Sequence, residues 1–318
     1  MKLLSGAEVR DLLDWPSVIE ALEEIFRTGC VTPVRHHHNV HVSSEPDATM
    51  LLMPAWTSEF LGVKIANVFP GNGRRDLPAV MATYLLSSAK TGLPLALVDG
   101  GELTARRTAG ASALAAKYLA RQDAKRLLLV GTGRVAANLA HAHSAVRPIE
   151  NIRVWGRSLT NAEKLAATLR NEGLSATAVD DLAGEVAAAD IVSCATLSTS
   201  PLVRGEWLRE GVHLDLVGGF TPGMREADDE AIRRASLFVD TRAGATVEAG
   251  DVVAPLQSGV LAHEDIRAEL SDFAHGRHLG RLADTEITLF KSVGASLEDL
   301  AAAILAYRRA EEREKDAA

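Results

Sequence analysis

The chain has 318 residues, of which 47% are hydrophobic and 24% are charged, and its formal net charge at pH 7 is -8. This composition is typical of a globular protein with two domains, and the acidic balance argues against nucleic acid or an anionic membrane as the main partner. Only two cysteines occur, Cys30 and Cys194, which excludes a disulfide framework and favours a reducing cytoplasmic setting, and no apolar run predicts a membrane span or a signal peptide.

Two helices followed by a sheet are predicted for the first hundred residues. Residues 5–8 read SGAE, the spacing of a capping box, and Asp14 offers a second N-cap with Pro16 just inside the helix, which Gly29 can end. From residue 34 the hydrophobic period changes to two, which predicts strands over VRHHHNVHV, TMLLMPAW, GVKIANVF, AVMATYLLSS and LPLALVDG. Because no helix separates these strands, we expect a largely antiparallel sheet.

The pattern of hydrophobic segments changes after an alanine-rich helix predicted over residues 103–120. Short apolar runs then alternate with helical or loop segments: KRLLLVGTG, NIRVWGR, LSATAV, ADIVSCAT, VHLDLVGG and ASLFVDT. This alternation predicts a Rossmann-type, doubly wound parallel sheet over residues 121–295.

The fold class expected from these patterns is α/β, with the Rossmann-type domain joined to an α+β domain. Residues 1–120 would form the α+β domain. A last helix over residues 296–318 is expected to pack on that domain through Leu297, Leu300 and Ile304.

The segment LLLVGTGRVAANLA carries the most informative motif. It places Gly131, Gly133 and Ala136 in a G-x-G-x-x-A pattern, directly after a buried strand and at the start of a helix. The first glycine permits a tight turn, the second lets a pyrophosphate approach the backbone, and the small third residue allows close helix packing. We therefore predict dinucleotide binding; a tight strand-to-helix turn without a ligand is the alternative.

The end of the next strand, VWGRSLTN, indicates which dinucleotide binds. An NAD site usually places an acid here for the ribose hydroxyls, but this chain has Gly156. Arg157, Ser158 and Asn161 can hydrogen-bond a 2'-phosphate, and the planar guanidinium suits phosphate in particular. The pattern favours NADPH, with NADH as a weaker cofactor.

Motifs spread over nearly the whole chain carry a family resemblance: MP before GVKIANVFPGN, LTARRTAGASALAAKYLAR, VGTG, MREADDEA and KSVGASLEDLAAA. They are similar to those of the ornithine cyclodeaminase and mu-crystallin family. The resemblance implies that the first domain binds substrate and forms a homodimer. It also implies that Arg35, Lys64 and Arg107 meet the substrate's α-carboxylate or reacting nitrogen, and that the loop around Val293 lies beside the substrate.

The three cations suit an α-imino or α-amino acid, because a buried carboxylate needs compensating charge and hydrogen bonds. Arg35 and Arg107 can orient the carboxylate. Lys64, whose neutral form nearby cations would favour, is the candidate proton source, directly or through water. Taken alone, each cation could instead be a solvent-facing side chain on its strand or helix.

The segment VHLDLVGGFTPGMRE places Phe220 at the start of the loop after its strand. In cyclodeaminases and the alanine dehydrogenase branch, the resembling loop carries an aspartate that assists loss or addition of ammonia or water. Phenylalanine cannot transfer a proton. The sequence here resembles the reductases of Δ1-pyrroline-2-carboxylate and Δ1-piperideine-2-carboxylate, whose substrates already contain the C=N bond and need only hydride and one proton.

The resulting prediction is an NADPH-dependent reductase of small cyclic imino acids that forms L-proline, with L-pipecolate as a second expected product. Its cofactor-binding residues are expected to be Arg107, Thr108, Gly131, Thr132, Gly133, Arg134, Val135, Trp155, Gly156, Arg157, Ser158, Asn161, Ala195, Thr196, Leu197 and Gly218. Two alternatives stay open: a cyclodeaminase or amino-acid dehydrogenase of the same family, and a non-enzymatic crystallin-like binding protein.

Metal chemistry is not expected, although RHHHNVH invites it. Successive side chains of a strand point to opposite faces, so His36, His37 and His38 cannot converge, and no carboxylates or cysteines lie at metal-ligand spacing. Cys194 is interpreted as a small buried residue beside the nicotinamide, and Asp215 as a structural hydrogen-bonding group.

Overall fold

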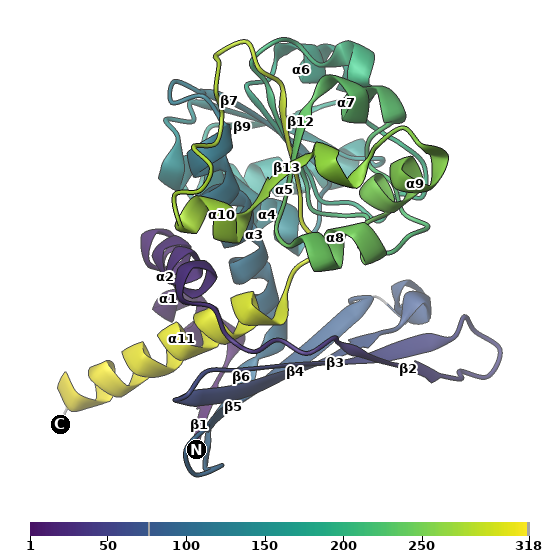
Figure 1. Ribbon diagram of the computed structural model, residues 1–318. Coiled ribbons are helices and arrows are strands. Elements are labelled where there is room, and N and C mark those ends of the chain that lie inside the picture. Colours follow the sequence, from purple (N-terminus) through teal and green to yellow (C-terminus); the bar gives the residue numbers. More distant parts are fainter. Residues whose placement is uncertain (76, 317–318) are drawn as a thin grey trace. The chain divides into compact units, whose positions relative to one another are not determined.

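The computed structural model describes residues 1–75 and 77–316 and divides the chain into two units (Figure 1). The first unit spans Met1–Arg107 and Ala295–Ala318, and the second spans Thr108–Gly294. The division between them falls inside the alanine-rich helix, whereas the sequence placed it after residue 120. Among the described residues, no helix is long and apolar enough to cross a membrane.

The helices and strands of the first unit are β1 (Lys2–Leu4), α1 (Gly6–Leu12), α2 (Trp15–Thr28), β2 (His36–Val40), β3 (Ala48–Trp56), β4 (Phe60–Val68), the 3-10 turn η1 (Pro70–Arg75), β5 (Val80–Ser88), β6 (Pro94–Asp99), the start of α3 (Gly100–Leu119) and α11 (Ser296–Asp316). The predicted caps are confirmed. The Ser5 hydroxyl accepts from the Glu8 amide at 3.4 Å while the Glu8 carboxylate accepts from the Ser5 amide at 2.8 Å. Asp14 caps α2, which ends at Gly29.

The sheet of the first unit has the strand order β1-β6-β5-β4-β3-β2. Its neighbours pair antiparallel from β2 to β6, as predicted, and the short β1, which the sequence pattern did not reveal, adds a parallel edge. α11 packs on one face of this sheet and against α1 and α2. Strand alternation therefore buries every second side chain of β4 beneath α11, including Lys64.

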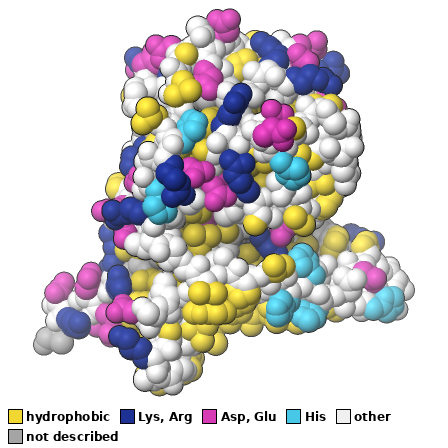
Figure 2. Space-filling view, viewed as in Figure 1, with side chains coloured by type: hydrophobic (Ala, Val, Ile, Leu, Met, Phe, Trp, Pro, Cys, Tyr) yellow, Lys and Arg dark blue, Asp and Glu magenta, His cyan; other side chains and the backbone are white. Residues whose placement is uncertain are grey.

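The opposite face of this sheet is apolar and exposed. Leu3 is 68% exposed and Met81 is 49% exposed, and Leu61, Ile65 and Leu97 lie on the same face. Figure 2 shows hydrophobic side chains gathered over the strands of this unit. Contiguous exposed apolar surface of this kind is rare on monomeric proteins and marks an interaction surface.

The second unit contains the remainder of α3, followed by β7 (Arg126–Val130), α4 (Arg134–Val146), β8 (Asn151–Trp155), α5 (Leu159–Asn171), β9 (Ala176–Val179), α6 (Leu182–Ala188), β10 (Ile191–Cys194), η2 (Gly205–Trp207), β11 (His213–Leu216), α7 (Asp229–Arg234), β12 (Ser236–Val239), α8 (Arg242–Glu248), α9 (Gly250–Ser258), η3 (His263–Asp265), β13 (Ile266–Glu269), α10 (Leu270–Ala274) and β14 (Thr288–Lys291). The strand order is β13-β12-β14-β11-β10-β7-β8-β9, and each neighbouring pair is parallel. The order reverses beside β7, as in a doubly wound sheet, so the predicted fold class is confirmed.

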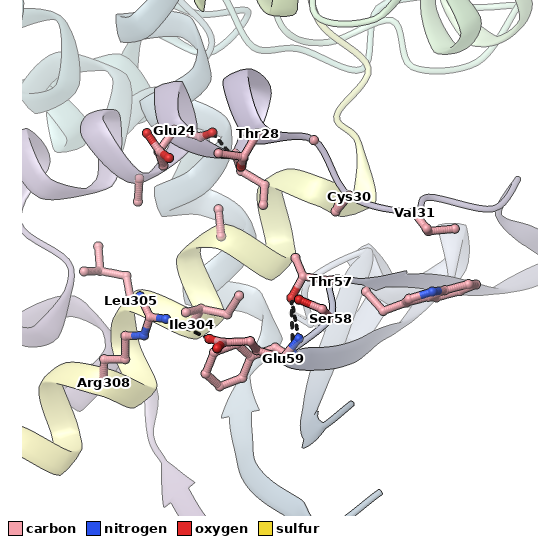
Figure 3. A pocket seen from close by; sticks show the side chains of 16 residues that line it. Glu24, Thr28, Cys30, Val31, Thr57, Ser58, Glu59, Ile304, Leu305 and Arg308 are labelled. Carbon is pink, nitrogen blue, oxygen red and sulfur yellow. Dashed lines mark hydrogen bonds and ion pairs between the residues drawn. The ribbon is translucent and has the colours of Figure 1, made fainter. Parts of the chain in front are cut away.

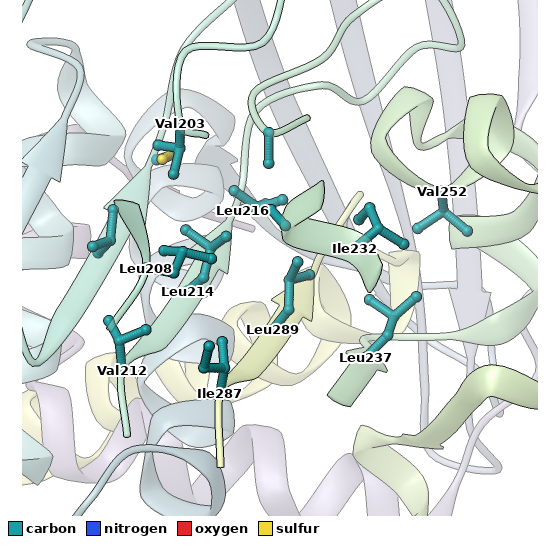
Figure 4. Packing of buried hydrophobic residues seen from close by; sticks show 14 of the residues in the cluster. Val203, Leu208, Val212, Leu214, Leu216, Ile232, Leu237, Val252, Ile287 and Leu289 are labelled. Atoms are coloured by element: carbon teal, nitrogen blue, oxygen red, sulfur yellow. The ribbon is translucent and has the colours of Figure 1, made fainter. Parts of the chain in front are cut away.

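The core of the second unit lies under β10, β11, β12 and β14. Leu214, Leu216 and Leu289 are fully buried, and Val212 and Ile287 pack with them at the start of their strands (Figure 4). Continuous apolar runs of this kind suit strands that are covered on both faces. The core anchors the loops that leave the carboxyl ends of these strands, where open α/β sheets bind their ligands.

Candidate functional site

A buried ionic cluster occupies the first unit beneath α11. The Lys64 ammonium lies 3.0 Å from Oδ1 and 2.8 Å from Oδ2 of Asp299. Arg107 donates through Nε to Asp299 Oδ1 at 2.8 Å and through Nη1 to Glu298 Oε2 at 2.7 Å. Both acids are fully buried, and the side chains of Lys64 and Arg107 are 4% and 5% exposed. Two cations and two carboxylates therefore balance in a site shielded from water.

Local structure explains how four residues far apart in sequence meet. Lys64 lies in the middle of β4, paired with Met53 on one side and Tyr84 on the other. Its side chain points inward because it shares the buried face of the sheet with these two buried residues. Glu298 and Asp299 lie in the first turn of α11, where carboxylates are favoured by the helix dipole. Arg107 reaches them from α3. These two acids were not predicted as site residues, although they lie in the motif KSVGASLEDLAAA that carries part of the family resemblance.

The cluster shifts the protonation equilibria of its members. Burial lowers the pKa of Lys64 to about 8, with Arg107 and Arg35 adding to the shift and Asp299 opposing it. Burial would raise the pKa of Asp299, but Arg107 and Lys64 outweigh burial and lower it. Lys64 is thus an ammonium at neutral pH that can release its proton more readily than an ordinary lysine, as an acid catalyst requires.

Arg35 lies just before β2 and is half-buried. It is close enough to Lys64 to depress the pKa of the ammonium, so the structure brings all three predicted cations into one electrostatic environment. The histidines that follow are exposed along β2, and Figure 2 shows imidazoles over this part of the first unit. The described residues contain no group of three or more His, Cys, Asp or Glu side chains that could hold a metal ion.

A cleft of about 950 Å³ also lies in the first unit, between α2, the turn from β3 to β4, and α11 (Figure 3). Thr57, Ile304 and Arg308 line it, and Arg308 lies 3.6 Å from Glu59 in an ion pair. Among the described residues that line the cleft, none was predicted to contact substrate. The volume of the cleft therefore does not identify it as the reaction site.

The turn between β7 and α4 fits a pyrophosphate. Gly131 has φ of 130°, and a Cβ there would lie 2.5 Å from the Ala195 carbonyl oxygen. A Cβ at Gly133 would point into open space, and no side chain caps the α4 N-terminus that follows. Ala136 is 1% exposed. The turn is therefore tight where the motif requires it, and the amides of α4 remain available to an anion.

The structure at the end of β8 gives a second reason why position 156 is a glycine and not an acid. A Cβ at this position would lie 2.7 Å from the Thr132 methyl group, so an acid here would crowd the turn. Ser158 caps α5 by accepting from the Asn161 amide at 3.4 Å. The Arg157 side chain is exposed beside them. The absence of an acid thus follows partly from packing, and the case for a 2'-phosphate rests on Arg157.

Most of the remaining residues assigned to the cofactor sit at the same edge of the parallel sheet. Trp155 ends β8, and its indole donates to the Asp180 carbonyl oxygen at 3.2 Å. The others at this edge lie in the turn and first residues of α4, or in the loops that follow β10 and β11: Thr132, Arg134, Val135, Ala195, Thr196, Leu197 and Gly218. Thr108 lies near the middle of α3. At the end of β10, burial raises the pKa of Cys194 well above its usual value, which is unsuited to a nucleophile.

Phe220 and Val293 lie in the loops after β11 and β14 of the second unit. Phe220 is half-buried. The Val293 amide donates to Asp240 Oδ2 at 2.8 Å, and the Gly294 amide donates to the same atom at 2.7 Å. Asp240, at the end of β12, thus holds the Val293 loop in place. Asp240 was not predicted as a site residue, because the Val293 and Gly294 amides that it binds are more than fifty residues away in the sequence.

Comparison with known proteins gives a consistent picture. The model of the ornithine cyclodeaminase/mu-crystallin family matches residues 1–314. The chain is 38% identical to the Delta(1)-pyrroline-2-carboxylate reductase of Paracoccus denitrificans, covering 94% of each protein. Its structure resembles that of the Thermococcus litoralis Delta(1)-pyrroline-2-carboxylate reductase in complex with NADH and L-proline, with a TM-score of 0.93, 37% identity, and coverage of 99% of this chain and 98% of that one.

A second solved structure, an archaeal alanine dehydrogenase dimer with bound NAD, matches with a TM-score of 0.90 and 30% identity. The match covers 99% of this chain and 97% of that one. Reductase and dehydrogenase relatives therefore share one fold, and the individual residues of the site must distinguish them.

Proposed function

The chain belongs to the ornithine cyclodeaminase/mu-crystallin family, and we propose that it is an NAD(P)H-dependent reductase of cyclic imino acids that converts Δ1-pyrroline-2-carboxylate to L-proline. Reduction of Δ1-piperideine-2-carboxylate to L-pipecolate is the same chemistry on a larger ring. The observation that carries the proposal is the Lys64 ammonium, buried against Asp299 with its pKa lowered to about 8. Reduction of a C=N bond to an amine needs one such proton.

Different residues of the chain would bind the substrate carboxylate and supply the proton. The buried side chains Lys64, Arg107, Glu298 and Asp299 carry two positive and two negative charges. Arg35 lies close enough to act on Lys64 and would assist the binding of a substrate carboxylate. Arg107 uses Nε and Nη1 on the two acids, which leaves Nη2 to donate to the substrate. Lys64 then gives a proton to the imine nitrogen, and Asp299 stabilises the ammonium until transfer. Orientation of a planar imine supplies much of the rate enhancement.

A dihydronicotinamide dinucleotide supplies the hydride when it is bound. Gly131, Gly133 and the N-terminus of α4 would hold its pyrophosphate, for which the open space at Gly133 leaves room. Arg157 would bind the 2'-phosphate of NADPH. We propose NADPH as the preferred cofactor and NADH as a weaker one.

Turnover assays with purified protein test the proposed function. Each cyclic imine should cause cofactor oxidation, with one L-proline or L-pipecolate formed per NADPH consumed, as measured by absorbance and chiral chromatography. L-Ornithine and L-alanine with NAD or NADP are the comparison substrates. A protein that binds NADPH in calorimetry but reduces neither imine would instead be a crystallin-like binding protein.

Arg157→Ala tests the cofactor preference. NADPH affinity should fall about tenfold, close to the lower limit for a hydrogen bond to a charged group, because the exposed Arg157 is screened by water. NADH affinity should not change, since NADH lacks the phosphate. Calorimetric titration of both cofactors into wild type and variant measures the difference. Equal losses for both would remove Arg157 from this role.

We further propose that the protein is a cytoplasmic homodimer. The exposed apolar face of the first unit's sheet, with Leu3, Leu61, Ile65, Met81 and Leu97, is continuous and self-complementary in character, as a two-fold interface requires. The alanine dehydrogenase relative is a dimer. Both cysteines are free thiols, which suits a reducing compartment. A monomer mass in sedimentation equilibrium would contradict the dimer, and cell fractionation checks the location.

A further inference from the structure

Three ionisable side chains are fully buried behind the loops that follow β10 and β11 in the second unit. They are Glu226, Asp251 and Lys291, each 0% exposed. They come from the loop before α7, from α9 and from the end of β14. Nothing in the proposed proton transfer or phosphate binding uses them. Three buried ionisable groups are costly unless their contacts compensate, so their partners indicate what they do.

Glu226 binds the loop after β10. Its Oε1 accepts from the Thr196 amide at 2.7 Å and from the Thr196 hydroxyl at 2.8 Å. The same oxygen faces the loop after β11, because a Cβ at Gly218 would lie 2.4 Å from it and 2.1 Å from the Thr196 carbonyl oxygen. The Glu226 carboxylate therefore fills the space where the two loops meet.

Asp251 and Lys291 link the Glu226 segment to the loop after β11. Asp251 Oδ1 accepts from the Glu226 amide at 2.8 Å and from the Ala227 amide at 3.0 Å. Lys291 Nζ lies 3.3 Å from Asp251 Oδ2 and donates to the Gly218 carbonyl oxygen. The contacts run from Thr196 through Glu226, Asp251 and Lys291 to Gly218, so one polar network holds both loops.

The polar network also lies close to the turn between β7 and α4, which is the predicted pyrophosphate site. The Cβ position of Gly131 lies 3.5 Å from the Thr196 methyl group. In a doubly wound sheet the dinucleotide crosses the edge at the switch point, which here lies between β7 and β10, with β8 on one side and β11 on the other. If the adenosine end lies toward β8 and Arg157, the nicotinamide end lies toward the loops that Glu226 joins.

We propose that Glu226 is a positioning residue, which with Asp251 and Lys291 holds Thr196 and Gly218 in the arrangement that binds and orients the nicotinamide end of the cofactor. This inference rests on the proposed cofactor site. Glu226 touches neither reacting atom and acts through Thr196 and Gly218. An isosteric acceptor should therefore preserve its function, and removal of the acceptor should release both Thr196 donors.

Kinetics and binding of Glu226→Ala and Glu226→Gln test the proposal. Glu226→Ala should lower kcat for pyrroline-2-carboxylate about 10²-fold, the effect of a small misplacement of reactants, and should weaken NADPH binding about tenfold. Glu226→Gln keeps an oxygen for Thr196 and, at pH 7, where Glu226 is about half ionised, should restore both values to within about threefold. Asp215→Asn is the matched control: it is a fully buried acid of the same unit, so it should lower thermal stability while leaving NADPH affinity unchanged.

Proton dependence of NADPH binding provides a second measurement that needs no turnover. The titratable groups that face Glu226 are Asp251, Lys291 and the Cys194 thiol. Burial raises the pKa of Glu226 to about 7, with Asp251 adding to the shift and Lys291 and Thr196 opposing it. The ionised form makes the stronger bonds to Thr196, so NADPH should bind about fivefold more tightly as pH rises through about 7. Glu226→Gln should lack this step.

The outcomes separate this inference from the proposed function. Glu226→Ala could keep the NADPH affinity and kcat of the wild type and show only a lower unfolding temperature. That result would assign Glu226 to stability alone. If Glu226→Ala does not fold, a pH step of equal size in wild type and Glu226→Gln would overturn the inference. Failure of imine reduction in the wild type, with the expected pattern in NADPH binding, would overturn the reaction and leave the positioning role standing.

Discussion

Replacing Lys64 by methionine should lower kcat for Δ1-pyrroline-2-carboxylate about 10²- to 10⁴-fold, the range that a positioned acid or base contributes. Lys64 lies 3.0 Å from Asp299 Oδ1 and is 3% exposed, so bulk solvent has little access to supply a proton in its place. Stopped-flow and steady-state oxidation of NADPH measure the loss. Lys90→Met, at an exposed turn of the same unit, is the control and should not change kcat.

The pH dependence of kcat tests whether Lys64 is the source of the proton. The active form is the ammonium, and its pKa is lowered to about 8, so kcat should be constant below about pH 8 and fall as pH rises through it. An ordinary lysine would keep its proton to much higher pH. The residual activity of Lys64→Met should lack this fall. An identical descending limb in the variant would show that another group delivers the proton.

Loss of Lys64 also removes one of the two cations paired with the buried carboxylates of Glu298 and Asp299, which can destabilise the fold by about 3–5 kcal/mol. The double variant Lys64→Met/Asp299→Asn restores the charge balance and should fold. Its kcat should stay as low as that of Lys64→Met, because it still has no acid. Arg35→Ala should act differently, raising KM more than it lowers kcat, since its charge serves carboxylate binding. Wild-type kinetics in all three variants would remove the cluster from the reaction.

Local sequence patterns predicted most helices and strands of this fold. Features that depend on contacts between residues far apart in the sequence could not be predicted in this way. The caps at Ser5 and Asp14 and the G-x-G-x-x-A turn depend on neighbours within a few residues, so the sequence displays them directly. Short strands such as β1 and β14 take their pairing from distant segments, and their brief apolar runs gave no distinct period. The same limit applies to sites. Lys64 was named from resemblance, but its partner Asp299 lies 235 residues away and only the folded chain joins them.

Gly156 shows that a correct pattern can have two causes. The missing acid favours NADPH when only the sequence is considered, and the structure adds that a side chain there would crowd Thr132. Packing alone could therefore select glycine. A prediction that depends on Arg157, whose exposed side chain has no packing duty, tests cofactor choice more directly.

The wild-type protein should reduce cyclic imines and release no detectable ammonia from L-ornithine with either cofactor. Cyclodeamination requires oxidation, attack by nitrogen and loss of ammonia, and each step moves protons at the substrate carbon. Phe220, half-buried after β11, cannot accept or donate them. An apolar ring at this position instead suits a substrate whose C=N bond already exists. Ammonia and NADPH should be followed in parallel on L-ornithine and on pyrroline-2-carboxylate.

Phe220→Asp should lower kcat/KM for the imine about tenfold or more, because it places a charge, or the water that hydrates it, against the substrate ring. Phe220→Leu keeps an apolar side chain and should stay within about threefold of wild type. The aspartate variant need not become a cyclodeaminase, since the rest of the site is unchanged. Ornithine-dependent ammonia release by the unaltered protein, at a rate that rivals imine reduction, would show that an aspartate at position 220 is not required and that Phe220 does not define the reaction.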